Sequence, residues 1–166
     1  CFGGVWSLYV NGHKVSEMAT SATAAVPAGF TIGRDSIAAY LNGSIADVRV
    51  YNRAISDSEI HELAQDALSS QVGPGFNGRA TGLLSHYEFS NSATTSPSGA
   101  IGGTIGATGA PTIGVGKDGD SNGAFSYSGT GQYYSAGSQI GLPAGDHPRT
   151  VCAWVRPSAY PIATSQ

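Results

Sequence analysis

The sequence predicts an all-β protein with one short helix. Several short segments alternate apolar and polar side chains, as half-buried strands do. Glycine is abundant, with 24 among 166 residues, and it provides the turns that many short strands need. The spacing of apolar residues becomes helical only near residues 56–68.

The central strand of this prediction is Ser44–Tyr51, which is rich in β-branched and aromatic residues. Alternation places Val48 and Val50 on one face and Asp47 and Arg49 on the other. An Asn-Arg-Ala turn follows. The segment therefore reads as a strand and a turn that lead into a helix.

The predicted helix covers Ser56–Leu68. Ser56 stands three residues before Glu59, which is the pattern of a capping box that satisfies free amides at a helix start. An apolar stripe at helical spacing follows, made of Ile60, Leu63, Ala64, Ala67 and Leu68.

Other alternating segments predict further strands. Val5–Val10 is followed by Asn11-Gly12, the dipeptide that best fits a tight hairpin turn. Thr150–Arg156 carries apolar residues on both faces, which is typical of a central strand. We expect the large aromatic residues of such strands in the core, with Trp6, Trp154, Phe89 and Phe125 as its anchors.

These motifs together resemble laminin-G-like jelly rolls of the concanavalin A-like lectin/glucanase superfamily. Ile45–Ser56 with the helix after it resembles the last strand and exit helix of that family, and Trp6–Gly12 resembles its late hairpin. Three later segments resemble the first, second and third strands, namely Gly82–Phe89, Ala124–Gly129 and Val151–Pro157. The resemblance implies an antiparallel jelly-roll sandwich whose parts occur here in permuted order.

The permuted order suggests a division of the chain. Residues 1–70 would form the C-terminal half of one sandwich, residues 71–81 a linker, and residues 82–166 the N-terminal half of the next. Two explanations stay open, a window across two tandem repeats or a permuted sandwich that closes on itself or on neighbouring chains. Either would leave strand edges that readily accept a strand from a partner.

Composition excludes some classes of partner. Charged residues make up 11% and the net charge is −3, so no basic surface predicts nucleic-acid binding. No apolar run approaches the ~20 residues of a membrane span, so we expect no membrane insertion.

Catalytic patterns are weak, and we expect no enzyme. Glycoside hydrolysis needs two carboxylates that face each other across a cleft. Asp118 and Asp120 have a suitable spacing, but they lie with Asn122 in a glycine-rich stretch that predicts a polar turn. His61–Gln65 lacks the second histidine of a zinc-protease motif, because Gln65 stands in its place.

The resemblance implies a structural calcium ion, held partly by acidic residues of the last strand. Asp47 matches one of these positions, but Ala46 stands at the other. In the loop after the first strand, where relatives often carry an aspartate, this chain has Thr94–Ser96. Ca²⁺ is therefore a candidate cofactor with Asp47 as a ligand. The alternative for Asp47 is a hydrogen bond to a loop or a salt bridge with Arg49 or Arg53.

Two features bear on export. Cys1 and Cys152 are a candidate disulfide or two buried thiols, and the mostly extracellular family favours the disulfide, within one chain or between two. Asn42-Gly43-Ser44 is a glycosylation sequon. We expect an extracellular or cell-surface glycoprotein.

The function expected from these features is a non-catalytic structural or adhesion module, a repeat of a fibre or surface protein. Its partners would be other copies of the chain or adjacent repeats. The alternative is a lectin-like carbohydrate-binding module, with or without calcium. Five tyrosines are candidate sugar platforms: Tyr9, Tyr40, Tyr133, Tyr134 and Tyr160. An aromatic residue on a strand is more often part of the core, so the sequence assigns no sugar site.

Overall fold

The computed structural model of the protein describes residues 4–19, 30–35, 37–65, 81–87, 105–136 and 147–158. Its elements are β1 (Val5–Val10), β2 (His13–Ala19), β3 (Phe30–Ile32), β4 (Asn42–Tyr51), α1 (Asp57–Gln65), β5 (Leu83–Tyr87), β6 (Ile105–Thr108), β7 (Thr112–Gly114), β8 (Ala124–Ser128), β9 (Tyr133–Ala136) and β10 (Thr150–Pro157). The strand pairs among these residues are all antiparallel. The fold is mostly β with one short helix, as the sequence predicts.

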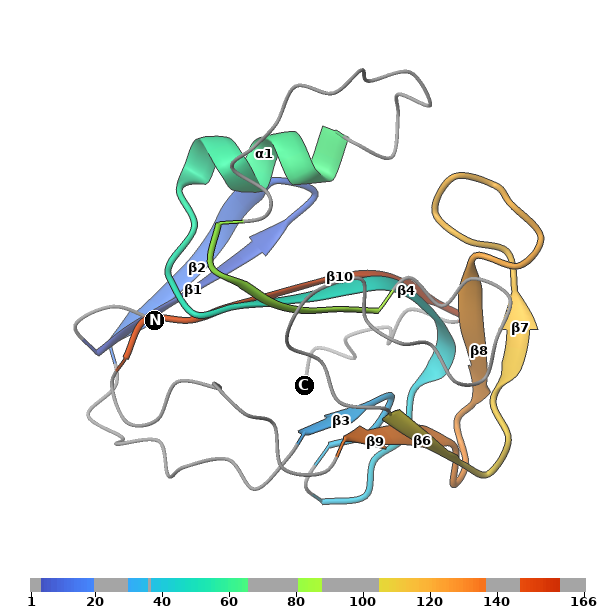
Figure 1. Cartoon of the computed structure of the whole chain (residues 1–166). Helices are drawn as coiled ribbons and strands as arrows, with labels where there is room; N and C mark the ends of the chain where they lie inside the picture. The colour runs from blue at the N-terminus through green and yellow to red at the C-terminus, as the bar shows by residue number, and fades with distance from the viewer. Residues whose placement is uncertain are drawn as a thin grey trace, which may run out of the picture.

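Strand β4 lies at the centre of the largest sheet (Figure 1). Strand β10 pairs along one edge of β4, from Gly43 to Tyr51. On the other edge β8 pairs with the first part of β4 and β5 with the last part. The sheet order is β10-β4-β8-β7, with β5 also bonded to β4. Strands from residues 1–70 and from residues 82–166 therefore share one sheet.

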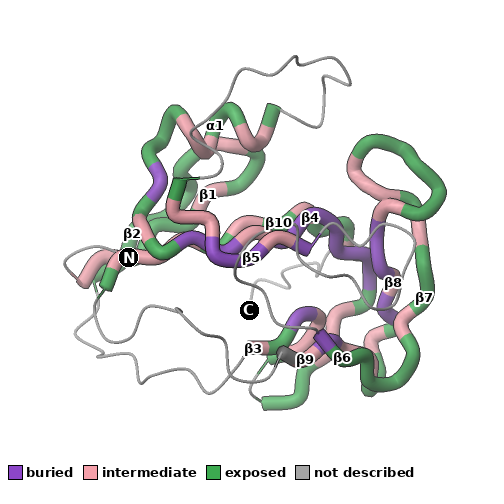
Figure 2. The backbone as a smooth tube through the Cα atoms, in the orientation of Figure 1, coloured by how far each residue is buried: buried purple, intermediate pink, exposed green. Residues whose placement is uncertain are grey.

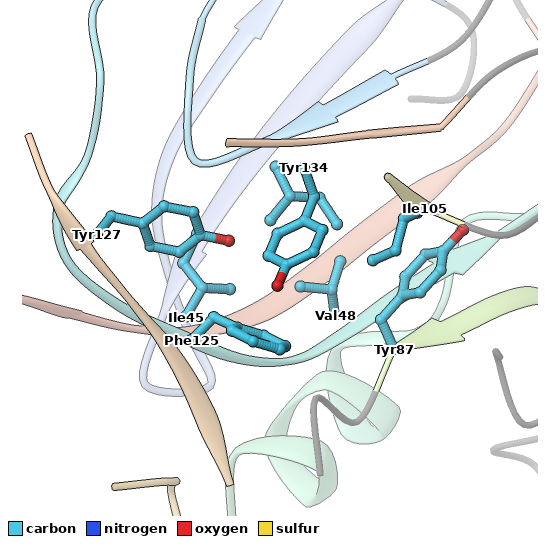
Figure 3. Packing of buried hydrophobic residues seen from close by; sticks show 8 residues of the cluster. Ile45, Val48, Tyr87, Ile105, Phe125, Tyr127 and Tyr134 are labelled. Atoms are coloured by element: carbon cyan, nitrogen blue, oxygen red, sulfur yellow. The ribbon is translucent and has the colours of Figure 1, made fainter. Parts of the chain in front are cut away.

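A second sheet, of order β3-β9-β6, faces the first and also mixes early and late segments of the chain. The core between them contains side chains from both sheets (Figure 3). Its buried members are Ile32, Ile45, Val48, Tyr87, Ile105, Phe125, Tyr127 and Tyr134. Figure 2 shows the buried stretch that β4 and β5 form through the middle of the molecule. The two sheets make a sandwich with a tyrosine-rich core.

Strands β1 and β2 form a separate two-stranded sheet. Asn11 and Gly12 have φ values of 51° and 80°, as both central residues of a type I′ turn require. The tip of the hairpin contacts α1, where the rings of His13 and His61 lie 5.6 Å apart. The Tyr9 hydroxyl donates a hydrogen bond to Asp57 Oδ1 at 2.5 Å. The hairpin is thus fixed to the helix.

Helix α1 begins with the predicted capping box. The Ser56 amide donates to Glu59 Oε2 at 2.7 Å, and the Glu59 amide donates to Ser56 Oγ at 3.3 Å. Residues 66–68 of the predicted helix lie outside the described residues. Within the described ranges no helix is both long and apolar enough to cross a membrane.

Two expectations about the core need correction. Trp6 is 46% exposed, because the β1–β2 sheet lies apart from the sandwich. Trp154 is only half-buried, and β10 is an edge strand rather than a central one, since among the described strands it pairs with β4 alone. Phe125 is fully buried, whereas Phe89 lies outside the described residues.

Candidate functional site

A β-bulge in β4 organises the most polar region of the sandwich. Ala46 pairs with Trp154 and Arg49 pairs with Cys152, so that two residues of β4 lie opposite one residue of β10. Asp47, inside the bulge, has φ of 50°, a left-handed conformation that aspartate tolerates better than most residues. Because of the bulge, Ile45 and Val48 both reach the core. The buried face of β4 therefore continues through the bulge, while the Asp47 side chain contacts Arg49 and His86.

The Asp47 carboxylate is held by two neighbouring side chains. Arg49 donates to it in a bidentate manner, from Nε to Oδ1 at 2.8 Å and from Nη2 to Oδ2 at 3.0 Å. His86 Nε2, on the adjacent strand β5, lies 2.5 Å from Oδ1. His86 is opposite Arg49 in the register of β4 and β5, which explains how a residue from the other half of the chain arrives here.

These contacts favour the charged forms of Asp47 and Arg49. Burial raises the pKa of Asp47, but the hydrogen bond from His86 and the charge of Arg49 outweigh burial, so the pKa lies below its usual value. Burial lowers the pKa of Arg49, and Asp47 more than restores it, so that the pKa of Arg49 is raised. The two side chains form a buried, charged pair.

A cleft of about 290 Å³ opens beside this pair. It is lined by Ala46, Asp47, Arg49, His86, Lys117, Asp118, Asp120 and Gly123. Lys117, from the loop between β7 and β8, places Nζ 3.0 Å from Asp118 Oδ2 and 3.8 Å from Asp47 Oδ2. The loop is closed by a hydrogen bond from the Gly116 amide to the Asp120 carbonyl at 2.9 Å. Both cationic and anionic side chains line the cleft.

The cleft does not fit the calcium ion that the resemblance implies. Calcium takes six to eight oxygen ligands, but both carboxylate oxygens of Asp47 already accept hydrogen bonds from nitrogen donors. Among the described residues no group of three or more His, Cys, Asp or Glu side chains could hold a metal ion. For Asp47 the alternative prediction is the one observed, a salt bridge with Arg49.

Two other predicted sites remain predictions. Asn42 is exposed at the start of β4, while the hydroxyl of Ser44 in its sequon lies 2.9 Å from that of Ser126. Cys152 is half-buried, and burial raises the pKa of its thiol to about 11. Cys1 lies outside the described residues, so no contact tests its pairing with Cys152.

The five tyrosines considered as sugar platforms lie in different surroundings. Tyr134 is buried in the core, Tyr9 is bonded to α1, and Tyr160 lies outside the described residues. Tyr40 and Tyr133 are half-buried neighbours with ring centroids 6.4 Å apart. The guanidinium of Arg34 lies 4.3 Å from the centroid of the Tyr133 ring. These three side chains make a small aromatic and cationic surface, which no local sequence pattern predicts as a unit.

Sequence reasoning also misses His86 and Lys117 as members of the cleft. Lys117 stands in no motif. His86 belongs to the Gly82–Phe89 segment, but nothing local marks it as a site residue, and it is 39 positions from the aspartate that it contacts. A signal does exist in the pairing of Gly82–Phe89 with Ser44–Tyr51, since the register of two paired strands determines which side chains are neighbours. That register follows from the fold rather than from local spacing.

Residues 2–61 match the model of a laminin G family, described as the concanavalin A-like lectin/glucanases superfamily. The match covers β1 to β4 and the first turn of α1. No curated protein and no solved structure matches the chain. Residues 2–61 therefore carry a laminin-G-like segment of the concanavalin A-like lectin/glucanase superfamily, within a chain that folds mostly as antiparallel β-sheet.

Proposed function

We propose that the chain is a non-catalytic structural or adhesion module of an extracellular or cell-surface protein. It acts by strand-to-strand contact with a neighbouring copy of the same domain. The observation that carries this proposal is the exposed edge and face of β10.

Strand β10 has the sequence of a central strand but the position of an edge strand. Its outer edge has no partner among the described strands. Val151 and Val155, on one face, are 66% and 53% exposed. An open strand edge with apolar side chains readily pairs with a further strand, and natural proteins usually protect such edges with charges or prolines. A neighbouring copy offers the same kind of edge, so that a shared sheet would bury both.

The β1–β2 hairpin also supports a role in contacts between proteins. Trp6, Leu8 and Val10 alternate along one face of β1, and all three are exposed. Met18, opposite Trp6 in the register, is exposed as well. A contiguous apolar surface of this kind is typical of a contact site between proteins.

The test is self-association of the purified chain, measured by sedimentation over a range of concentrations. We expect a reversible dimer or larger species, and a monomer for the variant Val151→Lys/Val155→Lys, since lysines on an edge strand oppose pairing. Val115→Lys is the matched control, because Val115 is also an exposed valine but lies outside β10. A wild-type chain that stays monomeric at every concentration would refute the proposal.

The chemistry of the cleft supports a non-catalytic role. A glycosidase needs one carboxyl group that can donate a proton near neutral pH, but Asp47 has a lowered pKa and is bonded to Arg49 and His86. Asp118 is paired with Lys117. A turnover assay on a panel of β-glucans should therefore show no activity above background.

A carbohydrate-binding module is the second candidate, and the surface of Arg34, Tyr40 and Tyr133 favours it. Sugar rings stack on half-exposed aromatic side chains, and a guanidinium next to the ring donates hydrogen bonds to sugar hydroxyls. A glycan array with and without chelator tests this candidate. Binding that is lost in Tyr133→Ala, but kept in Tyr9→Ala, would place the sugar on this surface.

A further inference from the structure

The ammonium group of Lys117 lies close to two carboxylates that line the cleft. Its Nζ atom lies between two carboxylates, 3.0 Å from Asp118 Oδ2 and 3.8 Å from Asp47 Oδ2. Its side chain is only 15% exposed, although lysine is usually among the most exposed residues. A compact positive charge between two carboxylates resembles the way in which a bound divalent cation joins acidic side chains.

Other side chains of the protein also form hydrogen bonds with the carboxylate oxygens of Asp47. Arg49 approaches both of its oxygens, and its side chain is 13% exposed. His86 approaches Oδ1 from β5. Buried charges persist only when they are paired, and here each donor comes from the chain itself. A divalent ion near Asp47 would meet the positive charge of the Arg49 guanidinium.

The loop that carries Lys117 is built to hold it there. The Gly119 amide donates to the Gly116 carbonyl at 3.2 Å, and the Gly116 amide donates to the Asp120 carbonyl at 2.9 Å. Asp118 pairs with Lys117 through both carboxylate oxygens, at 3.0 and 3.2 Å. The ammonium group is therefore held against Asp118 in the lining of the cleft.

We propose that Lys117, together with Arg49, replaces the divalent cation of laminin-G-like relatives, so that the fold of this chain does not depend on calcium. The proposal does not rest on the adhesive function, because it concerns the interior charge balance of the sandwich. It also predicts that any ligand bound in this cleft binds without calcium.

The first test compares thermal unfolding of the full chain in millimolar calcium chloride and in chelator. We expect the same melting temperature in both, and no heat of binding when calcium chloride is titrated into the chain. A calcium site with a Kd well below the ion concentration would raise the melting temperature by about 4 °C. Such a rise in the wild-type chain would overturn the proposal.

The second test removes the ammonium group. In Lys117→Gln the carboxylates of Asp47 and Asp118 lose their shared cation, so we expect a lower melting temperature in chelator and a partial recovery in calcium chloride. Lys117→Arg keeps the charge and should behave as the wild type. Lys14→Gln is the matched control, because Lys14 pairs with Glu17 at 2.9 Å on the exposed hairpin.

The outcomes separate cleanly. A melting temperature of Lys117→Gln that falls below that of Lys14→Gln in chelator and recovers in part in calcium chloride supports the proposal. A fall without any recovery in calcium chloride contradicts the substitution of Lys117 for a divalent ion. If Lys117→Gln equals the control in chelator and in calcium, Lys117 is an ordinary surface lysine and the proposal is wrong. Neither result depends on whether the chain self-associates.

Discussion

Asp47 and Arg49 show how much of a residue's role depends on its partner. Each side chain is nearly buried, and Arg49 would lose the carboxylate that pairs with it if Asp47 were replaced. Removal of one partner from a buried pair typically costs about 3–5 kcal/mol. We expect Asp47→Asn, which keeps the left-handed backbone accessible, to lower the free energy of unfolding by about 3 kcal/mol in denaturant titration.

The exposed pair Lys14–Glu17 provides the comparison for this prediction. Both side chains are largely in water, and such pairs contribute at most about 1 kcal/mol. Glu17→Gln should therefore change the stability little. Equal effects of Asp47→Asn and Glu17→Gln would mean that the Asp47–Arg49 pair is not a buried one.

Gly33 is a position at which an added Cβ atom should lower the stability. A Cβ atom there would lie 2.5 Å from the Tyr127 ring, and φ is +93°. Gly131 also has a positive φ, +65°, but a Cβ atom there would have no neighbour within 4 Å. We expect Gly33→Ala to cost about 3 kcal/mol and Gly131→Ala about 1 kcal/mol in chemical denaturation. Similar costs would show that Tyr127 moves aside easily.

At the scale of elements, the start of α1 is bonded to the turn before it and to the segment that leads into β5. Arg53 donates to both Glu59 carboxylate oxygens, at 2.6 and 2.9 Å, and its Nε donates to the Thr81 carbonyl at 2.9 Å. The helix start is thereby joined to the entry of β5. Loss of the capping box in Ser56→Ala should cost about 1 kcal/mol in denaturant titration.

The same contacts predict a pH dependence. The hydrogen bond from Arg53, with help from the Ser56 amide, lowers the pKa of Glu59 from 4.5 to about 2. Because the folded state has the lower pKa, this contribution to stability is complete above pH 4.5 and is lost as the pH falls towards 2. Thermal unfolding of Glu59→Gln should show a weaker loss across this range than the wild type does. Parallel profiles would contradict this assignment.

The sequence predicts those elements whose signals are local. The Asn11-Gly12 turn and the Ser56–Glu59 capping box each form within a few residues, and both are found as predicted. The bulge at Asp47 leaves no such signal, since it depends on how β10 pairs with β4. The prediction for Trp6 is wrong for a related reason, because alternation shows that a strand has an apolar face but not which surface covers it.

At the scale of the whole molecule, β4 joins the two halves of the chain. It pairs with β10, β5 and β8, all of which come from residues 82–166. We therefore expect residues 1–70 alone to unfold without a cooperative transition, and a mixture with residues 82–166 to regain strand structure by circular dichroism. A cooperative transition in residues 1–70 by themselves would favour two independent halves.

The pairing of β4 with late strands also has a consequence for synthesis. A hydrogen bond from the Ile55 amide at the end of this region to Thr150 Oγ1 spans 95 positions. A ribosome therefore releases β4 long before β10 exists, and contacts of such range form slowly. In the interval the nascent chain carries an unsatisfied apolar strand, which invites premature aggregation. Biogenesis of this protein should accordingly depend on holding factors that shield β4 until translation is complete.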